Sequence, residues 1–542
     1  MHTQNILHKN YTLAQSFYQL KLPLNIDYII PDNDSVRLLS QFVEEMNLSD
    51  LFTTYFRFRK NTATPRQMLK IMLYAYMNKI YSSRDIEKAC HRDVNFMYLL
   101  EDSKAPDHAT IARFRTLHFA SISKKLLAEV SNFLYEIGEV SGETIFIDGT
   151  KIEANANKYT FVWKKAVTKN QAKLLIRLTA FVADCEEQYG IKVVYDNKVT
   201  LRHIKKLRKK LYRIKSEESI EFVHGIGRRK MPLQKSIEQI EGYIDKLKEY
   251  NKKIYNCGSR NSYSKTDHDA TFMRMKEDAM LNGQLKPAYN LQHGVDSEYI
   301  TWISIGPQPT DTTTLIPFLK EIEENLVFKY KNITADSGYE SEENYLFIEK
   351  NEQVAFIKPA NYEISKTRKY KTDISRRENM DYDEERDVYI CKNQKELRVT
   401  GTKFEKTKTG YKREKTLYSC EDCKGCPYKT SCIKGNNSKI PMEERTKHLE
   451  VSKLFQKKRT EDLTRILSEE GCQLRMNRSI QAEGSFADTK EDMSFRRYLC
   501  RGGQNVLAES TLLAIAHNIN KLHHKIQSEK TGQHLFELKK SA

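Results

Sequence analysis

Two aspartates follow short apolar segments in widely separated parts of the chain. Asp148 comes directly after residues 144–147, Thr-Ile-Phe-Ile, and Asp336 comes directly after residues 332–335, Asn-Ile-Thr-Ala. Such segments are typical of buried strands, and the carboxyl end of a central strand projects its side chain into the crevice above the sheet. Carboxylates gathered there repel one another unless a divalent cation neutralises them, and hard oxygen ligands suit Mg²⁺ or Mn²⁺.

A carboxylate cluster of this kind can hold two metal ions and catalyse phosphoryl transfer. The alternative for either aspartate taken singly is a turn or cap residue, because Asp-Gly, as in Asp148-Gly149, is common turn chemistry.

A second cluster consists of four cysteines, Cys420, Cys423, Cys426 and Cys432. Four thiolates so close in sequence can close a tetrahedral Zn²⁺ site in a reducing compartment. The second and third cysteines are closer together than in a two-knuckle zinc ribbon, so unligated thiols and disulfides stay open as alternatives to structural zinc. Cys391 and Cys472 could join such a site, whereas a catalytic thiol is not expected because no activating base is identifiable.

The elements that must position the aspartates form a mixed α/β pattern. We expect strands at 144–147, 288–293, 299–305, 332–335 and 354–357, a hairpin turn at 294–298, and helices at 315–322 and 341–350. The order strand, hairpin, helix, strand, helix, strand predicts a layered α/β core.

Residues 1–140 form the expected N-terminal domain, which is helical from residue 35. Asp107 suits the cap of a short helix that carries Thr110, Arg113 and Arg115. Two short helices around a turn would be a helix-turn-helix, with these three residues as DNA contacts. An ordinary helical bundle with exposed arginines is the alternative.

Two further segments interrupt the α/β pattern. Apolar residues at helical spacing over 201–214 and 233–247 predict an antiparallel hairpin inside an insertion at 160–260, and residues 201–215 hold eight Lys/Arg and no acid. The candidate phosphate contacts of this segment are Lys205, Lys206 and Arg208. The alternative is that the basic face is simply exposed to solvent. Residues 361–445 are polar and predict a strand-poor, Cys-rich insert, followed by helices over 443–467 and 507–526.

Composition sets outer limits on the function. The 542 residues suggest three to four domains, and 90 Lys+Arg against 72 Asp+Glu leave a net charge of +18. This charge excludes an acidic solvating protein and favours a polyanionic partner, although many basic proteins bind no nucleic acid. Because the sequence has no long apolar run and no secretory signal, we expect a cytoplasmic protein without a membrane span.

Three motifs together resemble those of DDE transposases from bacterial insertion sequences, which are RNase H-like enzymes. They are Asp148-Gly149-Thr150-Lys151, then Ala335-Asp336-Ser337-Gly338-Tyr339, then Glu483-Gly484-Ser485-Phe486 ahead of Phe495-Arg496-Arg497-Tyr498. The resemblance covers the chain from about residue 35 to 525, and its specificity lies in the order and spacing of the motifs. Similar Cys clusters occur in part of this family.

The resemblance implies an RNase H-like core at 141–360 and 470–528, with Asp148, Asp336 and Glu483 as a triad that binds two Mg²⁺ or Mn²⁺ ions. Asp488, Glu491 and Asp492 compete for the third position. Relatives place Tyr, Arg and Lys at fixed steps around the catalytic Glu, and Lys490 matches as a phosphate clamp. The Tyr position is Met476 and the Arg position is Ser479, with Arg478 one residue off. The candidate DNA contacts here are Lys151, Lys490, Arg496 and Arg497.

The function implied by the resemblance is binding of terminal inverted repeats in double-stranded DNA, followed by metal-dependent cleavage and strand transfer. Cutting two element ends suggests a homo-oligomer on DNA. The alternatives are a catalytically inactive or domesticated DNA-binding derivative, an RNase H-like nuclease that does not join strands, and a zinc-dependent regulator built around the cysteines.

Overall fold

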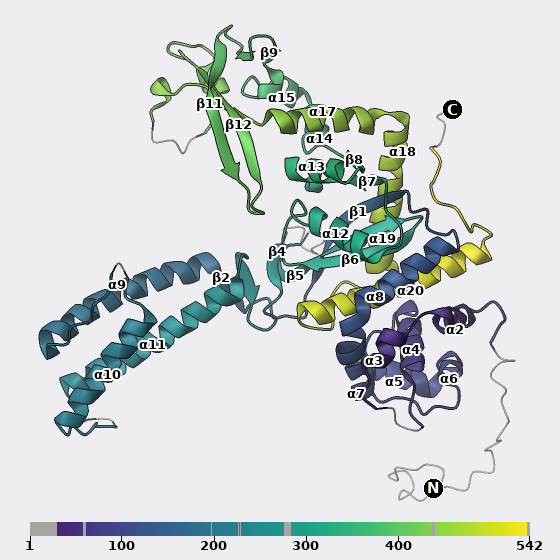
Figure 1. Cartoon of the computed structure of the whole chain (residues 1–542), viewed down its shortest axis with the longest axis horizontal. Helices are drawn as coiled ribbons and strands as arrows, with labels where there is room; N and C mark the ends of the chain where they lie inside the picture. The colour runs from purple at the N-terminus through teal and green to yellow at the C-terminus, as the bar shows by residue number, and fades with distance from the viewer. Residues whose placement is uncertain are drawn as a thin grey trace, which may run out of the picture.

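The computed structural model describes residues 30–57, 61–196, 198–225, 227, 229–275, 283–435 and 440–538. Figure 1 shows four parts: N-terminal helices, a central sheet with helices around it, a long helical arm, and a twisted antiparallel ribbon. In the described ranges, no helix is both long enough and apolar enough to cross a membrane.

The N-terminal helices are α2 (Ser35–Glu45), α3 (Ser49–Thr53), α4 (Pro65–Met77), α5 (Ser83–Arg92), α6 (Val94–Leu100) and α7 (His108–Arg113). Helix α4 starts with a capping box between Thr64 and Gln67, and the side chain of Asp107 caps α7 by accepting from the backbone N–H of Thr110. These observations confirm the helical N-terminal region.

Helix α7 is not the short second helix of a compact helix-turn-helix. It continues without a break through a π-helical segment, η3 (Phe114–Phe119), into α8 (Ala120–Glu136). The side chains of Ile111, Phe114 and Phe119 are buried along this stretch. Their burial keeps the helix packed against its neighbours over its whole length.

The central sheet has six strands in the described part of the chain. They are β1 (Thr144–Glu153), β4 (Thr271–Arg274), β5 (Leu285–Asp296), β6 (Tyr299–Gly306), β7 (Asn332–Ala335) and β8 (Val354–Ile357). The order is β6-β5-β1-β7-β8, with β4 also paired to β5. Strand β1 is antiparallel to β5 and parallel to β7, and β7 is parallel to β8. Helices α12 (Leu315–Asn325) and α13 (Glu342–Lys350) connect these strands, so the mixed α/β class is confirmed.

Strand β1 extends beyond Asp148, and the turn interpretation of Asp148-Gly149 is therefore wrong. The parallel ladder with β7 ends at the pair Ile147 and Ala335, but the antiparallel ladder with β5 continues to Glu153. Asp148 thus lies where β1 loses its parallel neighbour, rather than at the end of the strand.

Helices cover both faces of the sheet. On one face, Ile145, Ile147 and Ile333 belong to an apolar core that is continuous with the N-terminal helices. On the other, Phe146 and Phe356 pack against Ile466, Leu474 and Ala482. These last three residues come from α17 (Lys453–Leu467), α18 (Glu469–Arg478) and η7 (Ser479–Glu483). Helix α20 (Gly503–Gln527) lies beside α8, between the sheet and the N-terminal helices (Figure 1).

The arm contains three helices rather than the expected two. A short ribbon of β2 (Phe161–Trp163) and β3 (Ser262–Ser264) leads into α9 (Lys164–Tyr189), α10 (Leu201–Glu217) and α11 (Pro232–Cys257). Figure 1 shows these helices extending away from the sheet. Helix α9 supplies Leu178 and Phe181 to the core that α10 and α11 share. It completes the burial of apolar stripes that a two-helix hairpin would leave partly exposed.

The Cys-rich insert is rich in strands, contrary to the sequence prediction. Its five-stranded antiparallel sheet consists of β9 (Asp381–Asp383), β10 (Val388–Ile390), β11 (Glu396–Lys406), β12 (Lys412–Cys420) and β13 (His448–Val451). Most side chains of β11 are exposed, so no apolar alternation indicates the strand. Cross-strand ion pairs help to hold it, such as Lys415 with Glu405 and Glu450. We expected the following helix to begin at residue 443. It begins at Lys453 instead, because β13 occupies part of the segment before it.

Helix α17 is tied to the sheet through a buried carboxyl group. Asp462 accepts hydrogen bonds from the backbone N–H of Ile357 at 3.3 Å and from the hydroxyl of Tyr345 at 3.2 Å. Burial raises the pKa of Asp462 to about 7, so the folded state holds its proton more tightly than the unfolded chain does. Protonated Asp462 therefore adds to the stability of the fold. This added stability is fully present below about pH 4 and is lost as the pH rises through about 7.

We therefore predict that Asp462→Asn flattens the pH dependence of stability. Between about pH 5 and pH 8, the melting temperature of the wild type should fall by several degrees more than that of the variant. Thermal unfolding monitored by circular dichroism measures the difference. The exposed Asp381→Asn serves as the control and should follow the wild type. Parallel pH profiles for the wild type and Asp462→Asn would contradict the prediction.

Candidate active site

The register of the sheet places Asp148 and Asp336 side by side. Each directly follows one member of the last pair in the parallel ladder, Ile147 and Ala335. The backbone N–H of Gly149 donates to Asp148 Oδ1 at 2.8 Å, and the N–H of Gly338 donates to Asp336 Oδ1 at 2.8 Å. The two predicted strand-end carboxylates are thus neighbours with fixed orientations.

The third predicted carboxylate, Glu483, is close enough to interact electrostatically with this pair. Burial, together with the nearby carboxylates of Asp336 and Glu483, raises the pKa of Asp148 to about 6, against the lowering effects of Arg478 and of the Gly149 N–H. The fold therefore brings together the three carboxylates of the predicted triad.

Arg478 lies between two of these carboxylates. Its Nη1 is 3.6 Å from Asp148 Oδ2, and its Nη2 is 2.6 Å from Glu483 Oε1. The side chains of Arg478 and Asp148 are only 14% and 18% exposed, whereas that of Glu483 is 54% exposed. The guanidinium thus supplies positive charge at the point where the carboxylates crowd together.

A π-helical turn explains why Arg478 reaches Glu483 although it is five residues away. Segment η7 (Ser479–Glu483) joins α18 to α19 (Gly484–Ala487). In a π-helix the backbone hydrogen bonds connect residues five apart, so a side chain five residues before Glu483 can reach it. Ser479 Oγ, four residues before, also donates to Glu483 Oε1 at 3.4 Å. The spacing rule for an α-helix selects Ser479, and the π turn brings Arg478, one residue off that position, into contact with Glu483.

The segment that carries Glu483 is attached to the sheet through contacts with β5 and with Glu298. The ring of the buried His293 on β5 stacks on Phe486 at 4.2 Å, and its Nδ1 is 3.0 Å from Ser485 Oγ. On the same segment, Gln481 Oε1 accepts from the backbone N–H of Glu298 at 3.0 Å. These contacts lie on both sides of Glu483 along the chain and restrict where its carboxylate can point.

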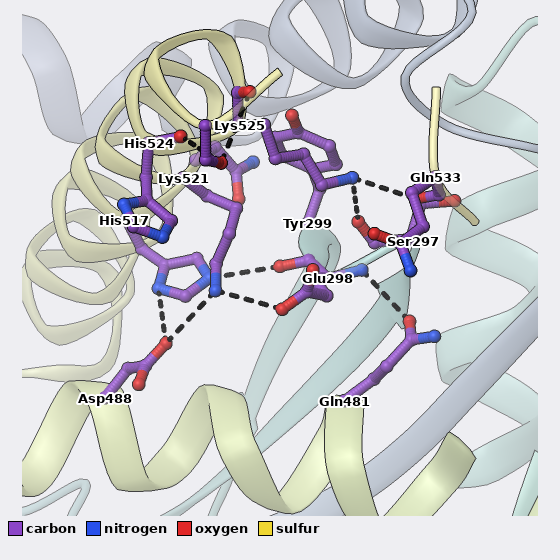
Figure 2. A network of polar contacts seen from close by, with 12 residues as sticks. Ser297, Glu298, Tyr299, Gln481, Asp488, His517, Lys521, His524, Lys525 and Gln533 are labelled. Atoms are coloured by element: carbon purple, nitrogen blue, oxygen red, sulfur yellow. Dashed lines mark hydrogen bonds and ion pairs between the residues drawn. The ribbon is translucent and has the colours of Figure 1, made fainter. Parts of the chain in front are cut away.

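Figure 2 shows a polar network that continues this attachment toward α20. Asp488 Oδ2 is 3.6 Å from His517 Nδ1 and 4.0 Å from Lys521 Nζ, and Lys521 also pairs with Glu298 at 3.1 Å. Asp488 belongs to the second π-helical segment, η8 (Asp488–Asp492). Because Asp488 pairs with α20 and the exposed Glu491 pairs with Arg496, two competitors of Glu483 have other partners.

Sequence reasoning missed a fourth carboxylate, Asp311. Its Oδ1 accepts from Asn290 Nδ2 at 2.6 Å and from Gln292 Nε2 at 2.9 Å. A Cβ atom placed on Gly149 would come within 2.9 Å of Asp311 Oδ1, so glycine allows the close approach. Asp311 follows a segment of Pro, Gln and Thr rather than an apolar strand, and for that reason it carries no strand-end signal.

The donor types at this site suit a hard divalent cation, but their present arrangement does not hold one. No three His, Cys, Asp or Glu side chains in the described ranges are arranged to ligate a metal ion. Carboxylate oxygens are suitable ligands for Mg²⁺ and Mn²⁺, and the Arg478 guanidinium is a cation standing among them. The residues therefore fit the implied ions, provided that Arg478 moves aside.

The N-terminal DNA-contact candidates divide by exposure. Thr110 and Arg113 are exposed on α7. Arg115 is buried, with Nη1 3.4 Å from the Tyr76 hydroxyl and 3.3 Å from the backbone carbonyl oxygen of Tyr81. Its assignment as a DNA contact is wrong, because π-helical segment η3 turns its side chain into the interior.

The other basic candidates lie in two separate regions. Lys205 and Lys206 are exposed on α10 of the arm, and Arg208 lines a shallow hollow of the arm with Lys209 and Tyr212. The remaining candidates lie nearer the carboxylates: Lys151 on β1, half-buried Lys490 on η8, and exposed Arg496 and Arg497. Arg497 Nε is 3.8 Å from Glu153 at the end of β1.

The cysteines of the insert gather at the base of its sheet. Cys423 hydrogen-bonds to Cys420, whose pKa burial raises to about 12, and Cys391, Cys423 and Cys426 all lie near Cys432. All are free thiols, and Cys472 lies apart on α18. Structural zinc in this insert stays a prediction.

Two family models match the chain. One, described as a transposase DDE domain, matches residues 390–523, and the other, described as a transposase domain (DUF772), matches residues 24–117. These matches confirm the resemblance to DDE transposases of insertion sequences. The first contains Glu483 and Arg478, whereas Asp148 and Asp336 lie outside both. Neither a curated protein nor a solved structure matches the chain.

We predict that Arg478 and Asp148 are energetically coupled in the metal-free protein. Arg478→Gln should lower the melting temperature at neutral pH, because it leaves the crowded carboxylates without their cation. In the Asp148→Asn background the same change should cost less, with a coupling on the order of 1 kcal/mol. Arg496→Gln, which removes an exposed arginine paired with Glu491, is the matched control and should show no coupling. Additive effects of the Arg478 and Asp148 substitutions in a double-mutant cycle would overturn the prediction.

Proposed function

We propose that this chain is a metal-dependent DNA transposase, which cleaves DNA at the ends of an insertion sequence and joins the freed 3′-hydroxyl to target DNA. The observation that carries the proposal is that Asp148, Asp336 and Glu483 lie close together, with Arg478 in contact with Asp148 and Glu483. Acidic groups from two parallel strands and a separate helical segment meet there in a protein with a net charge of +18. An acidic centre within a basic protein suits chemistry on a polyanion.

The strand order supports an RNase H-like core. The order β6-β5-β1-β7-β8, with β5 antiparallel to β1 and to β6, is the arrangement that we expect for such a core. The parallel pairings of β1 with β7 and of β7 with β8 end together at the site. In open α/β sheets, ligands bind in the crevice at the carboxyl ends of such strands.

Two bound Mg²⁺ or Mn²⁺ ions would supply activation of the attacking oxygen and stabilisation of the leaving one. Asp148 and Asp336 are oriented to hold them by the backbone N–H groups of Gly149 and Gly338. Once Arg478 leaves the carboxylates, its planar guanidinium suits a non-bridging phosphate oxygen of the DNA strand. Lys490, on the helical segment after Glu483, is our candidate to hold a neighbouring phosphate.

The arm and the N-terminal helices would grip DNA outside the reaction centre. Helix α10, which carries Lys205, Lys206 and Arg208, belongs to the arm that extends away from the central sheet (Figure 1). Contacts of this kind hold the phosphate backbone and do not read the sequence. Because transposition processes two element ends, we propose that two or more copies of the chain assemble on the DNA, each contributing one carboxylate site.

We predict that Asp148→Asn and Asp336→Asn each reduce Mg²⁺-dependent cleavage of DNA containing the element ends by at least about 100-fold. Each substitution removes a metal-ligand charge and keeps the side-chain volume, so DNA binding should persist. Gel electrophoresis of labelled DNA ends measures cleavage, and the same gel detects strand-transfer products. The exposed Asp422→Asn controls for the loss of one negative charge elsewhere.

The outcomes separate the alternative functions. Binding without cleavage by either the wild type or the variants would indicate a catalytically inactive derivative. Cleavage without any joined product would indicate a nuclease, and full activity of Asp148→Asn would refute the proposed site.

We predict further that replacing Lys205, Lys206 and Arg208 together by Gln weakens DNA binding without changing sequence preference. If each residue contacts one phosphate, the slope of log affinity against log salt concentration should become shallower by about 0.9 per contact. A salt titration by fluorescence anisotropy gives this slope. As a matched control, Lys246→Gln, Lys248→Gln and Lys252→Gln remove the same charge from α11 of the arm. An unchanged slope in the α10 variant would show that this face is only solvated.

A further inference from the structure

A cavity of about 580 Å³ lies within the N-terminal helices, at the start of α7. Its walls come from the end of α3, the start of α4 and the stretch from Lys104 through α7 to His118 on η3. Pockets of about 300–1,000 Å³ enclose ligands of the size of a nucleotide, whereas a DNA duplex is far too wide to enter one.

One wall of this cavity is aromatic. The ring of Tyr55 stacks on His118 with centroids 3.8 Å apart and planes within 6° of parallel. Phe52 and Phe114 also line the cavity. Burial lowers the pKa of His118, and Thr54 Oγ1 lies 2.9 Å from its Nδ1, so the ring stays neutral and fixed at neutral pH. A stacked pair of flat, uncharged rings is a surface on which a nucleobase can stack.

The opening of the cavity is basic. Arg57, Lys104 and Arg113 line it and are exposed. The acidic lining residue is Asp107, and its Oδ1 already accepts the backbone N–H of Thr110 at 2.6 Å to cap α7. Positive charge at the opening and aromatic rings inside match a nucleotide, whose phosphate is charged and whose base is flat.

We infer that this cavity binds one unpaired nucleotide of the DNA, with the base against the Tyr55 and His118 wall and the phosphate at Arg113. The inference rests on the proposed function, since it assumes that the chain binds DNA. It gives Thr110 and Arg113 a different role from reading bases in a groove. Both line the cavity, while the buried Arg115 contributes nothing to the outer surface of the helix.

The test uses the full chain without divalent ions and two short duplexes of the same sequence. One duplex is fully paired, and the other has a single unpaired 2-aminopurine. The wild type should bind the second duplex roughly 5- to 100-fold more tightly and should quench its 2-aminopurine fluorescence by stacking.

Arg113→Gln should remove most of this preference, measured as the ratio of the affinities for the two duplexes. Tyr55→Leu should remove both the preference and the quenching, and thermal unfolding checks that it folds. The matched control is Arg92→Gln, which removes an exposed arginine from α5 outside the cavity and should behave like the wild type. Because the Arg113 side chain is exposed, Arg113→Gln should fold normally. It therefore tests the inference even if Tyr55→Leu is unstable.

Equal affinity of the wild type for the two duplexes would overturn the inference and leave the proposed function standing. A preference that survives in Arg113→Gln, with quenching intact, would also overturn it, because the unpaired base would then bind elsewhere. Failure to bind either duplex would contradict the proposed function itself.

Discussion

Like-charge crowding at the end of one parallel ladder is the constraint around which this protein is built. Asp148 and Asp336 follow paired residues of adjacent strands, so the register itself forces two carboxylates together. Burial chiefly, and repulsion by Asp336 and Glu483 in addition, disfavours the charge on Asp148 and raises its pKa to about 6. Arg478 offsets part of this cost by contacting both Asp148 and Glu483. A site that must be neutralised by a cation is also one that a divalent ion can enter once the guanidinium leaves.

The rest of the core determines where Arg478 and Glu483 lie. Helix α18 packs across the sheet through Leu474 against Phe146 and Phe356, which fixes the position of its last residue, Arg478. The segment after it is attached at separate points by His293, by Gln481 and by the Asp488 network in Figure 2. A π-helical turn between these attachments brings Arg478 and Glu483 into contact. Packing of apolar residues and buried polar contacts therefore act together to hold one charged pair.

The sequence predicts the parts of this site that local patterns control. β-branched apolar segments indicate β1 and β7, and with them Asp148 and Asp336, because strand formation there depends on burial alone. The α-helical spacing rule does not identify Arg478, because the turn between Arg478 and Glu483 is π-helical. The strand-end pattern does not identify Asp311, because Asp311 follows an irregular segment. The exposed sheet of the Cys-rich insert has no apolar alternation, and burial of Arg115 depends on a π-helical turn. Each of these features is set by tertiary contacts or by local helix geometry that residue spacing does not reveal.

The most direct measurement is a crystal structure of the protein with Mn²⁺ and DNA, in which anomalous scattering locates the ions. We expect Mn²⁺ between Asp148, Asp336 and Glu483, with the Arg478 side chain displaced from Asp148 toward a phosphate of the DNA. Manganese bound elsewhere, or Arg478 still in contact with both Asp148 and Glu483 in the presence of Mn²⁺ and DNA, would contradict the proposed metal site.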